Sequence, residues 1–147
     1  DLQDENKRLT NMFIKKFLVN DQKTRRPGIL VKTFKEGAVY EGQLNNQSQR
    51  HGKGLFRYKE NQDLYFGDWK NDKFHGKGVY IFTKGDRYSG DLREGRKAGY
   101  GDYFYANGNI YKGQWLGDRK HGEGRFLYAN TNEEYEGMDN QASGSRA

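Results

Sequence analysis

The 147-residue chain contains no cysteine and a single proline. Without cysteine it can form neither a disulfide nor a thiolate metal site. Hydrophobic residues make up only 33% of the sequence. No apolar run approaches the roughly 20 residues that a membrane-spanning helix needs. Because Leu, Ile, Val and Met are scarce, a thick core between two layers of secondary structure is not expected.

Aromatic residues and glycine supply what the aliphatic residues do not. The chain has 11 Tyr, 9 Phe and 2 Trp beside 20 Gly. This aromatic content argues against a disordered chain. Rings combined with glycines and few aliphatic residues predict instead a thin sheet, in which the rings pack on bare backbone.

The basic charge of the chain is not concentrated enough to indicate nucleic acid. The net charge is +6, but residues 37–137 contain sixteen basic and fourteen acidic residues, a balance of +2. Nucleic-acid-binding surfaces normally carry a stronger basic stripe than this. We therefore expect no nucleic-acid partner. The chain begins at Asp1 without a methionine, and we expect it to be part of a longer protein.

Two short motifs alternate along the chain at a nearly fixed spacing. The first is "YEGQL" from Tyr40, "YFGDW" from Tyr65, "YSGDL" from Tyr88, "YKGQW" from Tyr111 and "YEGMD" from Tyr135. The second is "HGKGLF" at 51–56, "HGKGVY" at 75–80, "AGYGDY" at 98–103 and "HGEGRF" at 121–126. A fixed period of this length indicates stacked structural repeats. Four repeats are complete, and a fifth is cut off after its first strand begins.

Each repeat is predicted to form a β-hairpin. Tyr65, Gly67 and Trp69 stand at alternate positions of a first strand, and Gly76, Gly78 and Tyr80 do so in a second. Alternate residues of a strand share one face, so all the motif residues are predicted to point to the same side. Glycine under a ring also lets the strand bend. The prediction is a curved, single-layer, antiparallel sheet of about nine strands.

The pattern Y-x-G-x-[WL] followed by H-G-x-G-x-aromatic resembles the MORN repeat over about residues 40–137. "VKTFKEG" at 31–37 resembles the second strand of a degenerate earlier repeat. The resemblance implies an all-β, open array of stacked hairpins that serves as a binding and assembly module. MORN repeats occur in junctophilins, plant phosphatidylinositol phosphate kinases, ciliary radial-spoke proteins and apicomplexan cytoskeletal proteins. The resemblance therefore implies a location in the cytoplasm, at the cytoskeleton or on the cytoplasmic face of a membrane. It also allows the chain to be a regulatory domain of a larger enzyme such as a lipid kinase.

The chain is divided into a helix at 1–22, a linker at 23–30, the repeat array at 31–137 and a flexible tail at 138–147. The helix is amphipathic and basic, with its apolar residues on one broad side. These are Leu2, Leu9, Phe13, Ile14, Phe17 and Leu18. Three interpretations stay open: packing on the sheet as a cap, which the ends of repeat arrays need, attachment to a membrane, or the end of a coiled coil. Packing on the sheet is favoured, with Ile81, Phe104 and Leu127 as an apolar row on the other face.

Catalytic and metal sites are not predicted. His51, His75 and His121 occupy equivalent places in different repeats, so the nearest pair, His51 and His75, is expected to lie about 10 Å apart. A zinc ion holds histidine nitrogens at about 2 Å, which one ion cannot satisfy across that gap. We interpret the histidines as hydrogen-bonding partners of the hairpin turns. No nucleophile motif or phosphate-binding loop is present, so neither an enzyme activity nor a cofactor is expected.

The aromatic face is the predicted partner site. Residues 40–137 leave no sequence for a second layer over it, and a long open apolar groove normally marks an interaction surface. The alternative is that packing on glycine alone buries the rings. The groove is predicted to bind a helical or extended protein segment through Tyr40, Tyr65, Trp69, Tyr80, Phe82, Tyr88, Tyr103, Tyr105, Tyr111, Trp115, Phe126 and Tyr128.

One long edge of the array is predicted to be basic. The turns before each Gly-x-Gly have a charge balance of +5, and the opposite turns one of −2. The basic residues are Arg50, Lys70, Lys73, Arg93, Arg96, Lys97, Arg119 and Lys120. One interpretation is that these charges only keep the turns hydrated. Otherwise, they predict peripheral attachment to an anionic membrane carrying phosphoinositide or phosphatidic acid, since each contributes about 1 kcal/mol near such a surface.

The truncated fifth repeat predicts self-association. It ends in "MDNQASGSRA", which lacks a second strand, so the last strand would leave an edge with unpaired backbone groups. Pairing of two such edges would give a homodimer.

Overall fold

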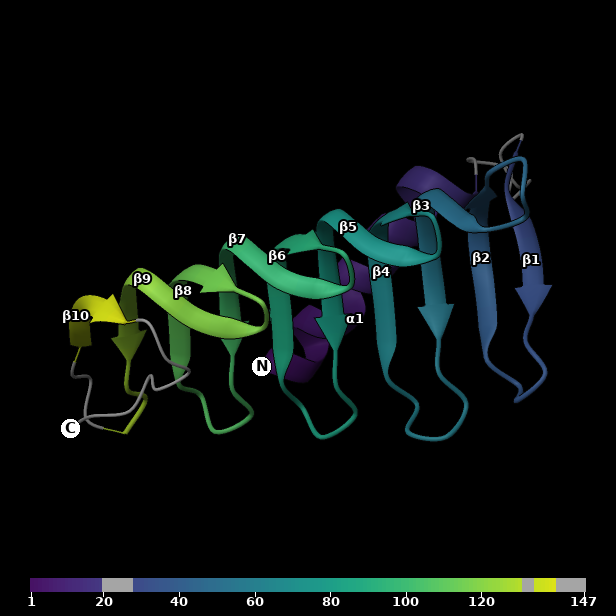
Figure 1. The fold of residues 1–147 in the computed structure, drawn as a ribbon. Helices are drawn as coiled ribbons and strands as arrows, with labels where there is room; N and C mark the ends of the chain where they lie inside the picture. Colours follow the sequence, from purple (N-terminus) through teal and green to yellow (C-terminus); the bar gives the residue numbers. More distant parts are fainter. Residues whose placement is uncertain (20–27, 131–133, 140–147) are drawn as a thin grey trace.

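The computed structural model describes residues 1–19, 28–130 and 134–139, and Figure 1 shows one layer of strands with a helix beside it. The helix α1 spans Leu2–Phe13 and continues as a short π-helix, η1, over Ile14–Leu18. Ten strands follow: β1 Leu30–Thr33, β2 Val39–Leu44, β3 Arg50–Arg57, β4 Leu64–Lys70, β5 Lys73–Ile81, β6 Arg87–Arg93, β7 Arg96–Phe104, β8 Ile110–Leu116, β9 Arg119–Leu127 and β10 Glu134–Asp139.

The ten strands pair in chain order in one antiparallel sheet, which confirms the predicted open meander. The number of strands is ten rather than about nine, because the "VKTFKEG" segment contributes β1 and the fifth repeat contributes β10. Of the predicted helix, residues 20–22 lie outside the described residues. The same holds for most of the predicted linker and for the tail from residue 140.

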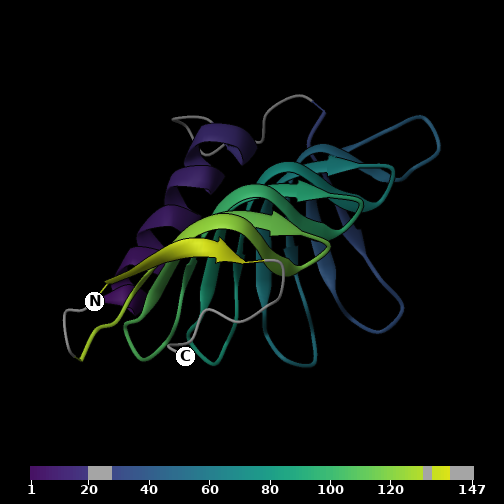
Figure 2. The ribbon, with the colours of Figure 1, turned by 60° about the vertical axis from the view of Figure 1, so that its left-hand side comes forward.

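The strand register superimposes the repeats. In every complete repeat the first-strand tyrosine pairs with an aromatic residue, as Tyr65 does with Tyr80, and the two central glycines pair with each other, as Gly67 does with Gly78. The register then shifts directly after the glycine of β2, β4, β6 and β8. A bulge bends its strand and increases its twist. Because the four irregularities are aligned, the sheet bends as a whole, and α1 lies on the outside of the bend (Figure 2).

The inner face of the sheet, opposite α1, explains why tyrosine and glycine recur together. A Cβ built on Gly78 or Gly101 would overlap the phenol ring of Tyr65 or Tyr88, so only glycine leaves room for the ring. Each of the four tyrosines donates its hydroxyl proton to the carbonyl three residues later, over 2.6–3.0 Å. The ring thus covers the glycine pair, and its polar end is satisfied by backbone.

The two tryptophans join neighbouring repeats on the same face. Trp69 Nε1 donates to the carbonyl of Gly54, and Trp115 Nε1 to that of Gly101, both at 3.1 Å. Trp69 meets Tyr40 and Tyr65 edge-on, with ring centroids 5.4 and 5.1 Å apart. Tilted and edge-to-face arrangements are the favoured geometries of aromatic pairs. A single layer can therefore bury large rings without a second layer above it.

The helix packs on the outer face, which is the favoured one of the three interpretations. Phe13 and Leu18 are buried against Leu55 of β3 and Phe66 of β4, with Val79 of β5 at the margin. The helix starts at Asp1, whose side chain caps it by accepting from the Asp4 amide at 2.9 Å. It covers the middle of the outer face and does not cap an end of the array (Figure 1).

A buried polar contact fixes the N-terminal half of α1. Arg87 is only 6% exposed, lies 4.0 Å from the ring centroid of Phe104, and donates from Nη1 to Oδ1 of Asn6 at 2.9 Å. Burial lowers the pKa of Arg87. Phe104 was predicted to contact the helix. It contacts Arg87 instead, and Arg87 is hydrogen-bonded to Asn6 of the helix.

Candidate interaction surfaces

The aromatic side chains of the inner face form two layers with different exposure. The lower layer lies directly on the sheet and is 0–6% exposed. It comprises Phe56 and the seven predicted groove residues Tyr40, Tyr65, Trp69, Tyr88, Tyr111, Trp115 and Phe126. The prediction that these seven side chains line an open groove is wrong for this conformation. Packing on glycine and on each other, the alternative considered from the sequence, already buries them.

The upper layer remains half-exposed and is continuous. It comprises Tyr58, Tyr80, Phe82, Tyr103, Tyr105 and Tyr128, all packed at the margin of the buried cluster or on one another. Ring centroids are 6.0 Å apart for Tyr58 and Tyr80, 4.5 Å for Tyr80 and Phe82, and 6.2 Å for Phe82 and Tyr103. Tyr103 and Tyr105 follow at 4.6 Å. Tyr128 is linked to Tyr105 through Phe126 of the lower layer, whose ring centroid lies 5.7 Å from Tyr105 and 4.6 Å from Tyr128. These six rings, the aromatic ladder, run across the array from β3 to the end of β9.

Three residues of the predicted basic edge lie on the inner face instead. Arg50 is 4.6 Å from the Trp69 ring, Lys97 is 5.4 Å from the Trp115 ring, and Lys120, 6% exposed, is within 5.4–5.9 Å of four rings. Phe74 fills the corresponding position in the second repeat and stacks on Tyr65 at 4.1 Å. These side chains turn inward because cation–π contact and burial of their methylene groups stabilise them there.

The other five basic residues of that edge are exposed on the outer face. They are Lys70, Lys73, Arg93, Arg96 and Arg119, and we call them the basic stripe. Strand pairing places Lys70 opposite Lys73 and Arg93 opposite Arg96. Lys73 lies 3.7 Å from Glu94. Within the described part of the chain, no carboxylate forms an ion pair with the other four.

Two acidic residues of the opposite edge, Asp63 and Asp86, are not part of an exposed charged rim. Asp63 and Asp86 are 7% and 6% exposed. Asp63 accepts a hydrogen bond from the Tyr80 hydroxyl at 2.9 Å, and Asp86 accepts one from Tyr103 at 2.7 Å. Burial raises the pKa of both phenols, and the hydrogen bond to the carboxylate raises it further.

The same two positions differ together in the other repeats. Where the aromatic residue is Phe56 or Phe126, which has no hydroxyl, the partner position holds Ala38 or Asn109 instead of an aspartate. Asn109 still accepts from the Ala129 amide at 2.9 Å, as Asp86 does from Ala106 at 2.8 Å. The chain thus places a carboxylate only where a tyrosine can donate to it. This pairing was missed from the sequence, although comparing the repeats position by position reveals it.

The histidines connect neighbouring repeats. His51 Nδ1 accepts from the Asn71 amide at 3.3 Å, and His75 Nδ1 accepts from the Glu94 amide at 3.4 Å. Both amides belong to the hairpin turn of the next repeat, which agrees with the interpretation of the histidines as turn partners. Among the described residues, no group of three or more His, Asp or Glu could hold a metal ion. A membrane-spanning helix is likewise not found among them.

The repeats observed in the structure coincide with those of a known family. The sequence model of the MORN repeat matches residues 40–61, 65–87, 88–110 and 111–133. The chain belongs to the MORN-repeat family. It is also similar to part of the inactive protein tyrosine kinase pTKL of Plasmodium berghei (strain Anka), with 50% identity over 46 residues, and of Plasmodium falciparum (isolate 3D7), with 43% over 42 residues. These segments are 31% and 29% of this MORN chain but only 3% of each kinase.

Proposed function

We propose that this MORN chain is a non-catalytic module that binds a helical or extended protein segment along the aromatic ladder. The observation that carries the proposal is the continuity of six half-exposed rings on a face whose lower layer is already buried. Aromatic side chains are frequent hot spots of protein interfaces. The names of the two similar proteins, both inactive kinases, also support a role without catalysis.

The dimensions of the ladder suit a helix or a short strand. Six strand spacings separate β3 from β9, which gives about 29 Å at 4.8 Å per spacing. A helix of about 19 residues has this length at 1.5 Å per residue. Arg50 and Lys97 lie beside the rings with side chains 18% and 21% exposed. Their charges are already paired with Asp72 and Asp118, so the ladder favours a partner with apolar anchors.

The test requires a partner recovered with the intact chain, followed by calorimetry on variants. Tyr105→Ala should weaken binding by about 1–2 kcal/mol, because its half-exposed ring is part of the ladder. Leu116→Ala is the matched control, since Leu116 is an apolar residue 58% exposed on the outer face. Equal affinity of both variants and the native chain would exclude the ladder as the binding surface.

A second candidate function rests on the basic stripe. Four of its five cations have no ion-pair partner in the described structure, and all five lie on one edge of the outer face. Each Lys or Arg near an anionic bilayer contributes about 1 kcal/mol, and the attraction fades within a Debye length. Together they would give peripheral, salt-sensitive attachment to an anionic membrane.

Sedimentation with liposomes tests this attachment. The native chain should bind vesicles that contain anionic lipid at low salt, and changing Arg93, Arg96 and Arg119 to Ser should abolish binding. The control changes Lys35, Lys59 and Lys112 to Ser, which removes the same charge from exposed positions outside the stripe. Binding that both variants lose equally would reflect net charge alone. No binding by the native chain at low salt would exclude the membrane.

A further inference from the structure

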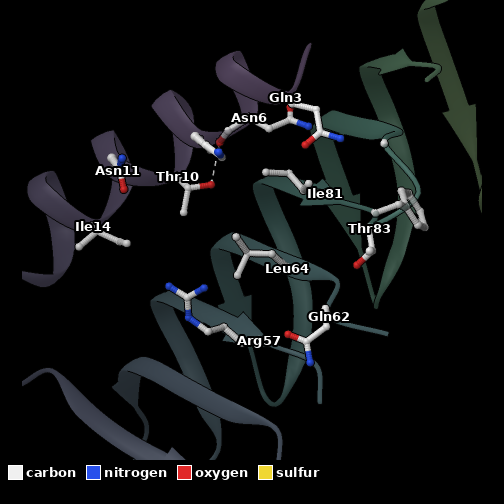
Figure 3. A pocket seen from close by; sticks show the side chains of 13 residues that line it. Gln3, Asn6, Thr10, Asn11, Ile14, Arg57, Gln62, Leu64, Ile81 and Thr83 are labelled. Carbon is white, nitrogen blue, oxygen red and sulfur yellow. Dashed lines mark hydrogen bonds between the residues drawn. The ribbon is translucent and has the colours of Figure 1, made fainter. Parts of the chain in front are cut away.

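A groove of about 540 Å³ lies between α1 and the outer face of the sheet. Figure 3 shows Asn11 and Ile14 on the helix, with Leu64 and Ile81 across from them on β4 and β5. The guanidinium group of Arg57, at the end of β3, extends between these two walls (Figure 3). The groove lies on the opposite side of the sheet from most of the aromatic ladder, although Phe82 of the ladder also lines it.

Arg57 occupies a position that is apolar in the other repeats. Ile81, Phe104 and Leu127 stand at the equivalent place, and the first two pack against α1 or Arg87. Arg57 is exposed, and no ion pair joins it to another residue of the described structure. Lys7 is the other charged residue of the groove, and no carboxylate lines it. The charge of the groove is therefore complementary to an anion.

The helix wall of the groove is polar in a way that fits a peptide backbone. Gln3 and Asn11 are exposed, and neither side-chain amide is hydrogen-bonded within the described residues. An amide offers both donors and an acceptor, as a peptide group does. The wall extends from Gln3 to Ile14, about 16 Å at the helical rise. About five residues of extended chain have this length.

We propose that this groove is a second binding site, which takes an extended peptide segment with one acidic residue. The acidic side chain pairs with Arg57, which can bind a carboxylate through two parallel hydrogen bonds. Apolar side chains next to it rest on Leu64, Ile81 and Ile14, and the amides of Gln3 and Asn11 bond the backbone. The proposal does not depend on binding at the aromatic ladder.

The test uses the intact chain and a library of random heptapeptides displayed on phage. Selection should enrich peptides with one Asp or Glu flanked by apolar residues. The best peptide, synthesised with blocked ends, should bind about tenfold or more weakly to Arg57→Gln, because a charge-assisted pair is lost. Arg57→Lys should retain part of the affinity. Arg119→Gln, an exposed arginine outside the groove, and Tyr105→Ala, on the ladder, should bind like the native chain.

Three results would overturn the proposal. One is a selection without acidic enrichment. Another is a selected peptide that binds Arg57→Gln as tightly as the native chain. The third would come from a titration with dodecanoate, a fatty acid that carries one carboxylate on an alkyl chain. If dodecanoate shifts the amide resonances of Ile14, Arg57 and Leu64 and the selected peptide does not, the groove takes a fatty acid and no peptide.

Discussion

The two faces of this sheet follow different rules. On the inner face the same kinds of residue recur in all four repeats, whereas on the outer face equivalent positions differ. One such outer position holds Glu41, Phe66, Ser89 and Lys112 in successive repeats, and another holds Leu55, Val79, Asp102 and Arg125. The helix lies where both positions are apolar, against Leu55, Phe66 and Val79. The inner face thus specifies the fold, and the outer face specifies what distinguishes one repeat from the next.

The difference has a physical cause. On the inner face each ring occupies space that only a glycine leaves free, and each tryptophan bonds the backbone of the preceding repeat. A change in one repeat therefore disturbs its neighbour. On the outer face, away from α1, side chains meet mainly water. Residues there are free to differ between repeats. An apolar residue on this face indicates a site that another segment covers, as the helix covers Leu55, Phe66 and Val79.

The largest expected effect comes from filling an inner glycine. Gly101→Ala places a methyl group against the phenol of Tyr88 and should destabilise the chain by about 3 kcal/mol, because an already packed core has no room. Asp102→Ala, the next residue on the outer face, should change the free energy of unfolding by less than about 0.5 kcal/mol. Urea unfolding measures both. Similar losses from the two variants would remove the distinction between the faces.

A comparable effect is expected at an outer position that the helix covers. Phe66→Ala should cost about 3 kcal/mol in the packing of α1, since this ring is 4% exposed and lies 5.1 Å from the Phe13 ring. Lys112→Ala, at the equivalent exposed position, should cost almost nothing. Hydrogen exchange of the α1 amides reports the change directly. Unchanged protection of α1 in Phe66→Ala would contradict the assigned helix contact.

The sheet should also lose stability at high pH, through the tyrosines of its inner face. Burial raises the pKa of Tyr105 to about 12, and raises those of Tyr40, Tyr65 and Tyr88 as well. In the unfolded chain these phenols ionise near pH 10. Their stabilising effect is therefore complete below about pH 10 and is lost as the pH rises toward 12. Tyrosinate absorbance and near-ultraviolet circular dichroism should change together. Complete ionisation of the tyrosines near pH 10, with intact dichroism, would argue against buried phenols.

The smallest effect sharpens the rule for aspartate and tyrosine pairs. Tyr103→Phe should destabilise the chain by about 1–2 kcal/mol, because it removes the hydroxyl that bonds the buried Asp86 carboxylate. Adding Asp86→Asn should recover part of the loss, since Phe126 and Asn109 form this combination naturally in the fourth repeat. A double-mutant cycle from urea unfolding gives the coupling. Additive losses would mean that the pairing has no energetic basis.

Much of the fold follows from the sequence, because glycine and ring spacing determine both strand register and face. The strand order, the inward tyrosines and the helix all follow from residue types at fixed positions. Side-chain direction at the turns does not. Arg50, Lys97 and Lys120 were placed on a basic edge, but contact with several rings draws them inward. The sequence also predicts too much exposure for the lower-layer rings. Their burial comes from contacts between rings of neighbouring repeats, such as Tyr40 with Trp69, and the sequence spacing does not show these contacts.

The place of the helix was predicted only in part. Ile81 belongs to its contact, whereas Leu55, Phe66 and Val79 were not recognised. Their signal is visible once equivalent positions of the repeats are aligned, because charged or small residues stand there elsewhere. The groove beside Arg57 could not be predicted, since it exists only where α1 and the sheet meet.

Hydrogen exchange of a Phe13→Asp variant tests the central claim most directly. Phe13 is 8% exposed in the outer-face cluster, and a buried carboxylate there should detach α1. If the inner face alone specifies the fold, the α1 amides lose protection while those of β4 to β8 keep it. Simultaneous loss of protection in α1 and the strands would show that the sheet depends on its helix, and would contradict the account.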